Sequence, residues 1–130
     1  TLNNHLDLAA TPEETTKRVL TAFTDPQRIR RDDPGRPEVC NVYSLHKIFS
    51  GAEATQTVYD ECTTAARGCV DCKRHLADSI NDYLKDLRER REEIKARPGY
   101  VQEILHEGGK KARAIAQETI AEVYEKMGLG

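Results

Sequence analysis

Four cysteines constrain this chain more than any other feature, because only a particular path of the backbone can bring their sulfur atoms together. They are Cys40, Cys62, Cys69 and Cys72, with the spacing C-x21-C-x6-C-x2-C. The last two form a C-x-x-C turn, which lets two thiolates point to one centre. Four thiolates are the ligand set of tetrahedral zinc and of [4Fe–4S] clusters. The pattern therefore predicts a structural metal or cluster site, and the spacing alone does not decide between zinc and a cluster.

Other uses of these thiols remain open at this point. Disulfides suit a secreted chain, whereas the composition here is typical of a cytoplasmic protein. Unligated cysteines also pack as small apolar side chains. A redox-active C-x-x-C usually stands between a strand and a helix, and no strand pattern precedes this one. His75 lies one turn after Cys72 and could replace a cysteine in a zinc site, although a surface position fits it equally well.

Apolar residues recur at helical spacing along most of the chain, and no stretch of useful length alternates as a strand does. Thr11-Pro12-Glu13-Glu14 has the pattern of a helix start, with a capping threonine, a proline at the first helical position and a glutamate three residues after the cap. The sequence predicts an all-α fold, a single helical domain of four to five helices that carries the four-cysteine site. The first expected helix begins near residue 12, and the others lie over 41–49, around 57–59, over 71–96 and over 101–127. The helix over 71–96 would be about 40 Å long. In the last one, Gly108-Gly109 marks a kink, a close helix approach or a break.

Composition limits the classes of protein to which the chain can belong. The 130 residues suffice for one modest core. No run of eighteen apolar residues exists, so we expect no membrane association. The formal net charge is −2, but a proline-rich loop over 25–38 gathers several arginines. Local basic patches can bind phosphates on a weakly acidic protein because salt screens distant charges, although solvated surface is the plainer interpretation.

Five stretches of this sequence, in order, resemble the C-terminal half of bacterial tryptophanyl-tRNA synthetases. They are residues 24–26, 37–43, 68–73, 108–116 and 123–129. Residues 1–4, Thr-Leu-Asn-Asn, are also similar to the segment directly after the family's Lys-Met-Ser-Lys-Ser loop. The resemblance thus implies two parts: a segment over 1–10 that comes after this catalytic loop, and a C-terminal helical anticodon-binding domain over 11–130.

The resemblance also favours one occupant of the cysteine site. In a subset of the family, four cysteines in nearly this arrangement bind a [4Fe–4S] cluster beside the surface that recognises the anticodon. The first gap here is one residue shorter than the spacing expected of that subset. The resemblance therefore implies that Cys40, Cys62, Cys69 and Cys72 hold a [4Fe–4S] cluster, with zinc as the second choice.

The resemblance implies a role in protein synthesis. The family uses ATP to attach tryptophan to tRNA(Trp) in the cytoplasm, and its intact enzymes are homodimers. Its ATP and tryptophan sites lie upstream of these helices, in motifs that this stretch lacks. We therefore expect the 130 residues alone to be inactive as a ligase, and to contribute recognition of the tRNA(Trp) anticodon loop.

Basic residues near the cysteines are the candidates for RNA contacts. A guanidinium group can hydrogen-bond to base edges, stack on unpaired bases and neutralise phosphates. The candidates are Arg28, Arg30, Arg31 and Arg36 in the loop before Cys40, with Lys73 and Arg74 beside Cys72. Two other functions remain open: a stand-alone iron–sulfur redox sensor, and a helical module that docks a partner protein through its long charged helix.

Overall fold

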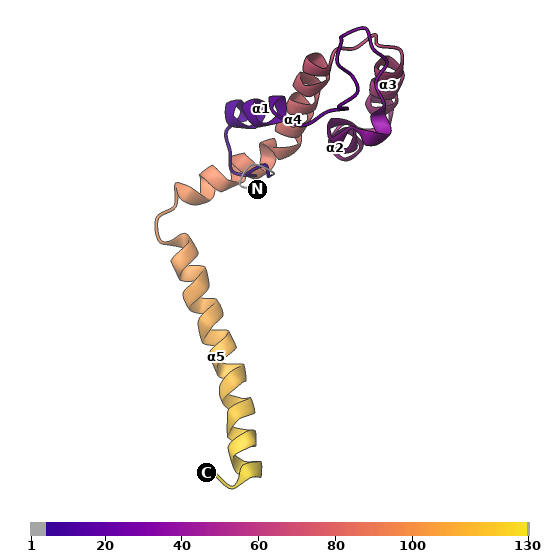
Figure 1. Ribbon diagram of the computed structural model, residues 1–130. Coiled ribbons are helices and arrows are strands. Elements are labelled where there is room, and N and C mark those ends of the chain that lie inside the picture. Colours follow the sequence, from indigo (N-terminus) through magenta and orange to yellow (C-terminus); the bar gives the residue numbers. More distant parts are fainter. Residues whose placement is uncertain (1–4, 130) are drawn as a thin grey trace. The chain divides into compact units, whose positions relative to one another are not determined.

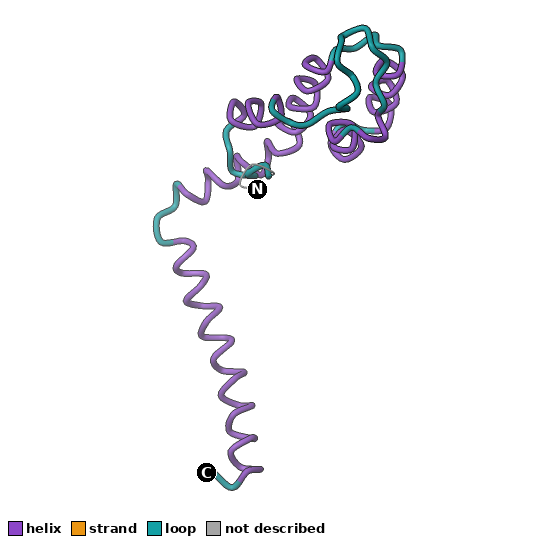
Figure 2. The backbone as a smooth tube through the Cα atoms, in the orientation of Figure 1, coloured by secondary structure: helices purple, strands orange, loops and turns teal. Residues whose placement is uncertain are grey.

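Helices account for all the regular structure of the part of the chain that the computed structural model describes, residues 5–129 (Figure 1; Figure 2). Residues 1–4, with their resemblance to the end of a catalytic loop, lie outside the described residues. The elements are α1 (Pro12–Leu20), the short 3-10 helix η1 (Pro37–Val39), α2 (Asn41–Phe49), α3 (Ala52–Thr63), α4 (Cys69–Lys95) and α5 (Tyr100–Met127). The predicted all-α fold with four to five helices is confirmed.

The chain forms two compact units, whereas the sequence predicts a single helical domain. Unit 1 is Thr1–Arg88 and unit 2 is Glu89–Gly130, so the boundary falls inside α4. The physical reason is the distribution of apolar side chains. The last buried residue of α4 is Leu84, and no described residue of unit 2 is buried.

The first helix begins as its sequence predicts. The Thr11 hydroxyl accepts a hydrogen bond from the Glu14 amide at 3.2 Å, and the Glu14 carboxylate accepts one from the Thr11 amide at 2.9 Å. This capping box satisfies two of the amides that a helix start leaves without partners. With its start fixed, α1 presents Thr15 and Val19 to the interior of unit 1.

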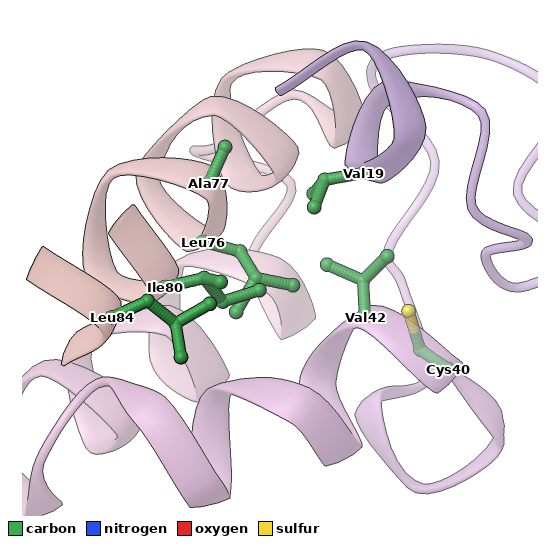
Figure 3. Packing of buried hydrophobic residues seen from close by; sticks show 7 residues of the cluster. All are labelled: Val19, Cys40, Val42, Leu76, Ala77, Ile80 and Leu84. Atoms are coloured by element: carbon green, nitrogen blue, oxygen red, sulfur yellow. The ribbon is translucent and has the colours of Figure 1, made fainter. Parts of the chain in front are cut away.

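The core of unit 1 forms where one face of α4 packs with side chains from α1 and α2 (Figure 3). Leu76, Ile80 and Leu84 recur every four residues, so they lie on one face of α4, and each is at most 4% exposed. The whole cluster comprises Val19, Cys40, Val42, Leu76, Ala77, Ile80 and Leu84. Helix α2 in turn packs against α3 and η1, which places the ends of all three elements close together.

A buried histidine ties α2 to the first turns of α4. The His46 ring is fully buried, with Nδ1 2.7 Å from Ser50 Oγ, and the Ser50 hydroxyl donates to Ser79 Oγ at 3.0 Å. Its Nε2 lies 3.2 Å from the carbonyl oxygen of Cys72 and 3.5 Å from that residue's Sγ. Burial lowers the pKa of His46 to about 4, against the opposing effect of the Cys72 carbonyl. The ring is therefore neutral at pH 7.

Unit 2 consists of the end of α4 and the whole of α5. Helix α5 continues without interruption through Gly108-Gly109, and a Cβ added at either glycine would meet no atom within 4 Å. The pair therefore marks neither a break nor a close approach in the described chain. Gly128 ends the helix in the left-handed conformation at φ 69°, as a C-terminal cap should. None of the helices within residues 5–129 is long and apolar enough to cross a membrane.

We expect the stability of the folded chain to fall in mild acid because of His46. Since its folded pKa of about 4 lies below the value of about 6.5 in the unfolded chain, the unfolded chain binds more protons below pH 6.5. The free energy of unfolding therefore has its full value above pH 6.5 and decreases as the pH falls towards 4. The total decrease due to His46 is about 3 kcal/mol. The neighbouring His75 ring and Arg67 guanidinium act in the same direction, because both oppose a charge on His46.

The measurement is urea unfolding at several pH values for the wild-type chain and for His46→Gln, which carries no titrating ring. Carboxylates titrate in both proteins, so the difference between the two free energies of unfolding isolates His46. A difference that stays constant between pH 7 and pH 4 would contradict the expectation.

Candidate functional site: a four-cysteine pocket beside a basic loop

All four cysteines line one pocket of unit 1. Cys40 lies between η1 and α2, Cys62 is near the end of α3, and Cys69 and Cys72 occupy the first turn of α4. The four thiols are free, and the pocket holds about 270 Å³ of empty space, including the part that opens to solvent. Its other lining residues are Thr24, Arg28, Val42 and Arg67. The structure thus brings together cysteines that are up to 32 positions apart in the sequence, Cys40 and Cys72.

Two features of the backbone bring Cys62 into the pocket. The Gly35 amide donates to the Cys62 carbonyl at 2.9 Å, and a Cβ at Gly35 would clash with Cys62 Sγ, so only glycine leaves room for the sulfur. After α3, Ala65 adopts the left-handed conformation at φ 59°, and the Arg67 amide donates back to the Glu61 carbonyl. This tight turn leads directly from Cys62 to Cys69.

Burial keeps the Cys72 thiol protonated at neutral pH. Together with the charges of the neighbouring cysteines, it raises the pKa of Cys72 to about 12. Burial likewise raises the pKa of Cys62. Two arginines act against these shifts: Arg28 lowers the pKa of Cys62, and Arg67 lowers that of Cys72. A metal centre that binds here must therefore displace protons, so its affinity increases with pH.

Arg28 is held at the wall of this pocket. Its Nη2 donates to the carbonyl oxygens of Arg31 and Arg67, both at 2.8 Å, and its Nη1 lies 3.9 Å from Cys62 Sγ. Its Nε is buried and has no hydrogen-bond acceptor among the described residues. The other arginine of the pocket wall, Arg67, pairs with Glu61 and places Nη1 3.2 Å from His75 Nδ1.

Besides Arg28, two more of the predicted RNA-binding residues are engaged within the fold. Arg36 forms a two-pronged ion pair with Asp25, at 2.6 and 3.0 Å, and the Arg36 guanidinium holds the pKa of that carboxyl well below its ordinary value. Lys73 Nζ donates to the carbonyl of Leu20 at 3.0 Å. Both side chains therefore help to fix the loop that comes after α1.

The remaining RNA candidates point to solvent. Arg30 and Arg31 are exposed, and their guanidinium groups have no hydrogen bond or ion pair with any residue in 5–129. Arg74 is exposed and pairs at 3.4 Å with Asp71 of the same helix. The Arg31 Nε lies 3.7 Å from the position that a Cβ at Gly68 would occupy, so the loop and the start of α4 are neighbours. Beside the cysteine pocket, then, lies an edge with three exposed cations.

Within the described residues, no group of three or more His, Cys, Asp or Glu side chains is placed to hold a metal ion. His75, the alternative zinc ligand suggested by the sequence, does not line the pocket and lies instead against His46 and Arg67.

Three residues that shape the pocket were not among the predicted site residues. Arg67 stands two positions before Cys69, and a cation so close to a C-x-x-C pair could have been noted. Gly35 and His46 carry no such signal, because their contacts with Cys62 and Cys72 come from the tertiary fold.

Comparison with known proteins places this chain in a family. Residues 1–85 match the family model described as tRNA synthetases class I (W and Y). The chain is 44% identical over 118 residues to the tryptophan--tRNA ligase of Aquifex aeolicus, and the matched region covers 90% of this chain and 30% of that protein. It is 39% identical over 127 residues to the tryptophan--tRNA ligase of Thermotoga maritima, and the matched region covers 97% of this chain and 39% of that protein.

A solved structure resembles this fold closely. The crystal structure of tryptophanyl-tRNA synthetase from Campylobacter jejuni superposes with a TM-score of 0.86 at 30% sequence identity, covering 98% of this chain and 41% of that one. The chain thus spans 30–39% of the length of the Aquifex and Thermotoga ligases. Because the family model matches well over half of its residues, this chain belongs to the class I tRNA synthetases of the tryptophan and tyrosine group.

Proposed function

We propose that this chain is the tRNA-recognising, helical part of a tryptophan–tRNA ligase, and that its four cysteines hold a [4Fe–4S] cluster. The observation that carries the proposal is the pocket of four free thiols beside exposed arginines, in a chain similar over nearly its whole length to tryptophan--tRNA ligases. The intact ligase attaches tryptophan to tRNA(Trp) with ATP and acts as a homodimer, and its ATP and tryptophan sites belong to the upstream part.

The residues of the pocket fit a [4Fe–4S] cluster. Four thiols are the ligand set of such a cluster, and each binds a different iron. Arg28 Nη1 lies 3.9 Å from Cys62 Sγ, where it could donate to a sulfur of an anionic centre. The cluster would contribute a rigid cross-link between α2, α3 and α4.

The loop between α1 and η1 has the chemistry to meet an RNA loop. Ile29 is 86% exposed, and Arg30 and Arg31 come next with exposed guanidinium groups. The carboxylate of Asp33 accepts a hydrogen bond from the Arg30 amide at 2.7 Å, which helps to hold the backbone of this loop. Unpaired bases need stacking surfaces, donors for their edges and cations for their phosphates, and these three residues offer all of them.

We expect anaerobically purified protein to be brown and to contain about four iron and four sulfide per chain. Cys69→Ser should lower both contents strongly, because it removes a ligand, while Thr63→Ser outside the pocket should leave them unchanged. The measurements are the visible absorption spectrum with iron and sulfide assays. One zinc per chain without sulfide would contradict the cluster, and protein free of metal would contradict any ligated site.

We also expect specific binding to tRNA(Trp) that weakens as salt increases. If Arg30 or Arg31 contacts a base, its replacement by Gln should weaken binding by about 1–3 kcal/mol. If it contacts a phosphate, the replacement should lower the salt slope, the dependence of log K on log salt concentration, by about one. Arg90→Gln removes the same charge from the exposed surface of α4 in unit 2 and serves as the matched control. Filter binding at several salt concentrations measures both quantities. Equal affinity for an unrelated tRNA would refute specific recognition.

A further inference from the structure

One guanidinium group contacts both the cysteine pocket and the exposed basic loop. We propose that Arg28 is a positioning residue that couples the occupant of the pocket to the conformation of residues 29–33, the stretch that includes Ile29, Arg30 and Arg31. The inference rests on the proposed function, since it concerns the same pocket and the same RNA-binding loop. It gives Arg28 a role different from the direct RNA contact that its sequence predicts.

The first step is how the donors of Arg28 are distributed. A guanidinium has five N–H donors in a fixed planar arrangement. Nη2 uses its two on the carbonyl oxygens of Arg31 and Arg67, at 2.8 Å each. Nη1 reaches the pocket, where it lies 3.9 Å from Cys62 Sγ. Nη2 is thus satisfied by two carbonyl oxygens, whereas Nη1 has only a long contact with a sulfur atom.

The second step concerns what would satisfy the donors of Nη1. A buried donor without a good partner is costly, and a charged one more so. A neutral thiol is a weak hydrogen-bond acceptor. A centre held by four thiolates is anionic and its sulfur atoms accept hydrogen bonds, so it would hold Nη1, which lies 3.9 Å from Cys62 Sγ. Filling the pocket therefore stabilises the orientation of Arg28 that the structure shows.

The third step is the consequence for the loop. Since the guanidinium is planar and rigid, fixing Nη1 also fixes the direction of Nη2, which donates to the carbonyl of Arg31. The same nitrogen bonds to the carbonyl of Arg67, just before Gly68 and Cys69, so the loop is tied to the chain that enters α4. The bound centre thereby orders the segment that presents Ile29, Arg30 and Arg31. An empty pocket releases it.

Hydrogen exchange provides the test. Backbone amide exchange is measured over residues 29–33 in protein loaded with its cluster and in protein cleared of it by chelation. In the wild type, loading should slow exchange at least about tenfold. In Arg28→Lys, which keeps the charge but not the planar group, the slowing should disappear while iron and sulfide contents remain. Arg30→Lys, in the same loop, should keep the slowing and serves as the matched control.

Binding to tRNA(Trp) gives a second readout. Arg28→Lys in the loaded protein should weaken binding about tenfold without changing the salt slope, because no phosphate contact is lost. Arg30→Gln should instead lower that slope by about one if Arg30 contacts a phosphate. An Arg28→Gln variant whose salt slope falls like that of Arg30→Gln would assign Arg28 to the RNA and overturn the coupling.

Failure of the inference can be told apart from failure of the proposed function. Wild-type protein that binds neither iron nor sulfide overturns both. Protein that loads the cluster but does not bind tRNA(Trp) refutes the RNA proposal, while the exchange experiment still decides on Arg28. If loading leaves the exchange of residues 29–33 unchanged in the wild type, the coupling is wrong, whatever the variants do.

Discussion

Burial of one face of α4 is the constraint on which the rest of unit 1 depends. Leu76, Ile80 and Leu84 lie at intervals of four residues and pack into the core, and Cys72 lies one interval earlier on the same face. A helix cannot bury this ridge without directing Cys72 inward as well. The hydrophobic packing of α4 against α1 and α2 therefore also determines where the cysteine pocket forms.

Much of the fold and part of the site could be predicted from local sequence. The capping residues at Thr11, the apolar spacing in α2 and α4 and the cap at Gly128 are local signals, and the helices begin and end near them. The division at Arg88 could not be predicted, because Ile104 and Ile115 of α5 have the spacing of a buried face and yet are exposed. Periodicity shows that residues share a face, and only tertiary packing decides whether that face is covered.

The site shows the same division between local and tertiary information. Convergence of the cysteines on one pocket is predicted by their spacing, whereas the roles of the basic residues are not. Arg28, Arg36 and Lys73 had the same appearance in the sequence as Arg30 and Arg31, but the fold gives the first three internal partners. A pattern of charges identifies a basic segment and cannot separate cations that bind a ligand from cations that bind the protein's own carbonyls.

These internal arginines change how a weakly acidic chain can recognise RNA. A flexible loop with four free arginines would lose conformational entropy in every side chain and in its backbone on binding. Here Arg36 bonds to Asp25 and Arg28 to two carbonyls, so internal contacts restrain the backbone before the RNA binds. Arg30 and Arg31 are left as the groups that contact solvent. In the proposed complex, fewer cations bind the RNA, but each loses less entropy, and the inorganic centre beneath them sustains that order.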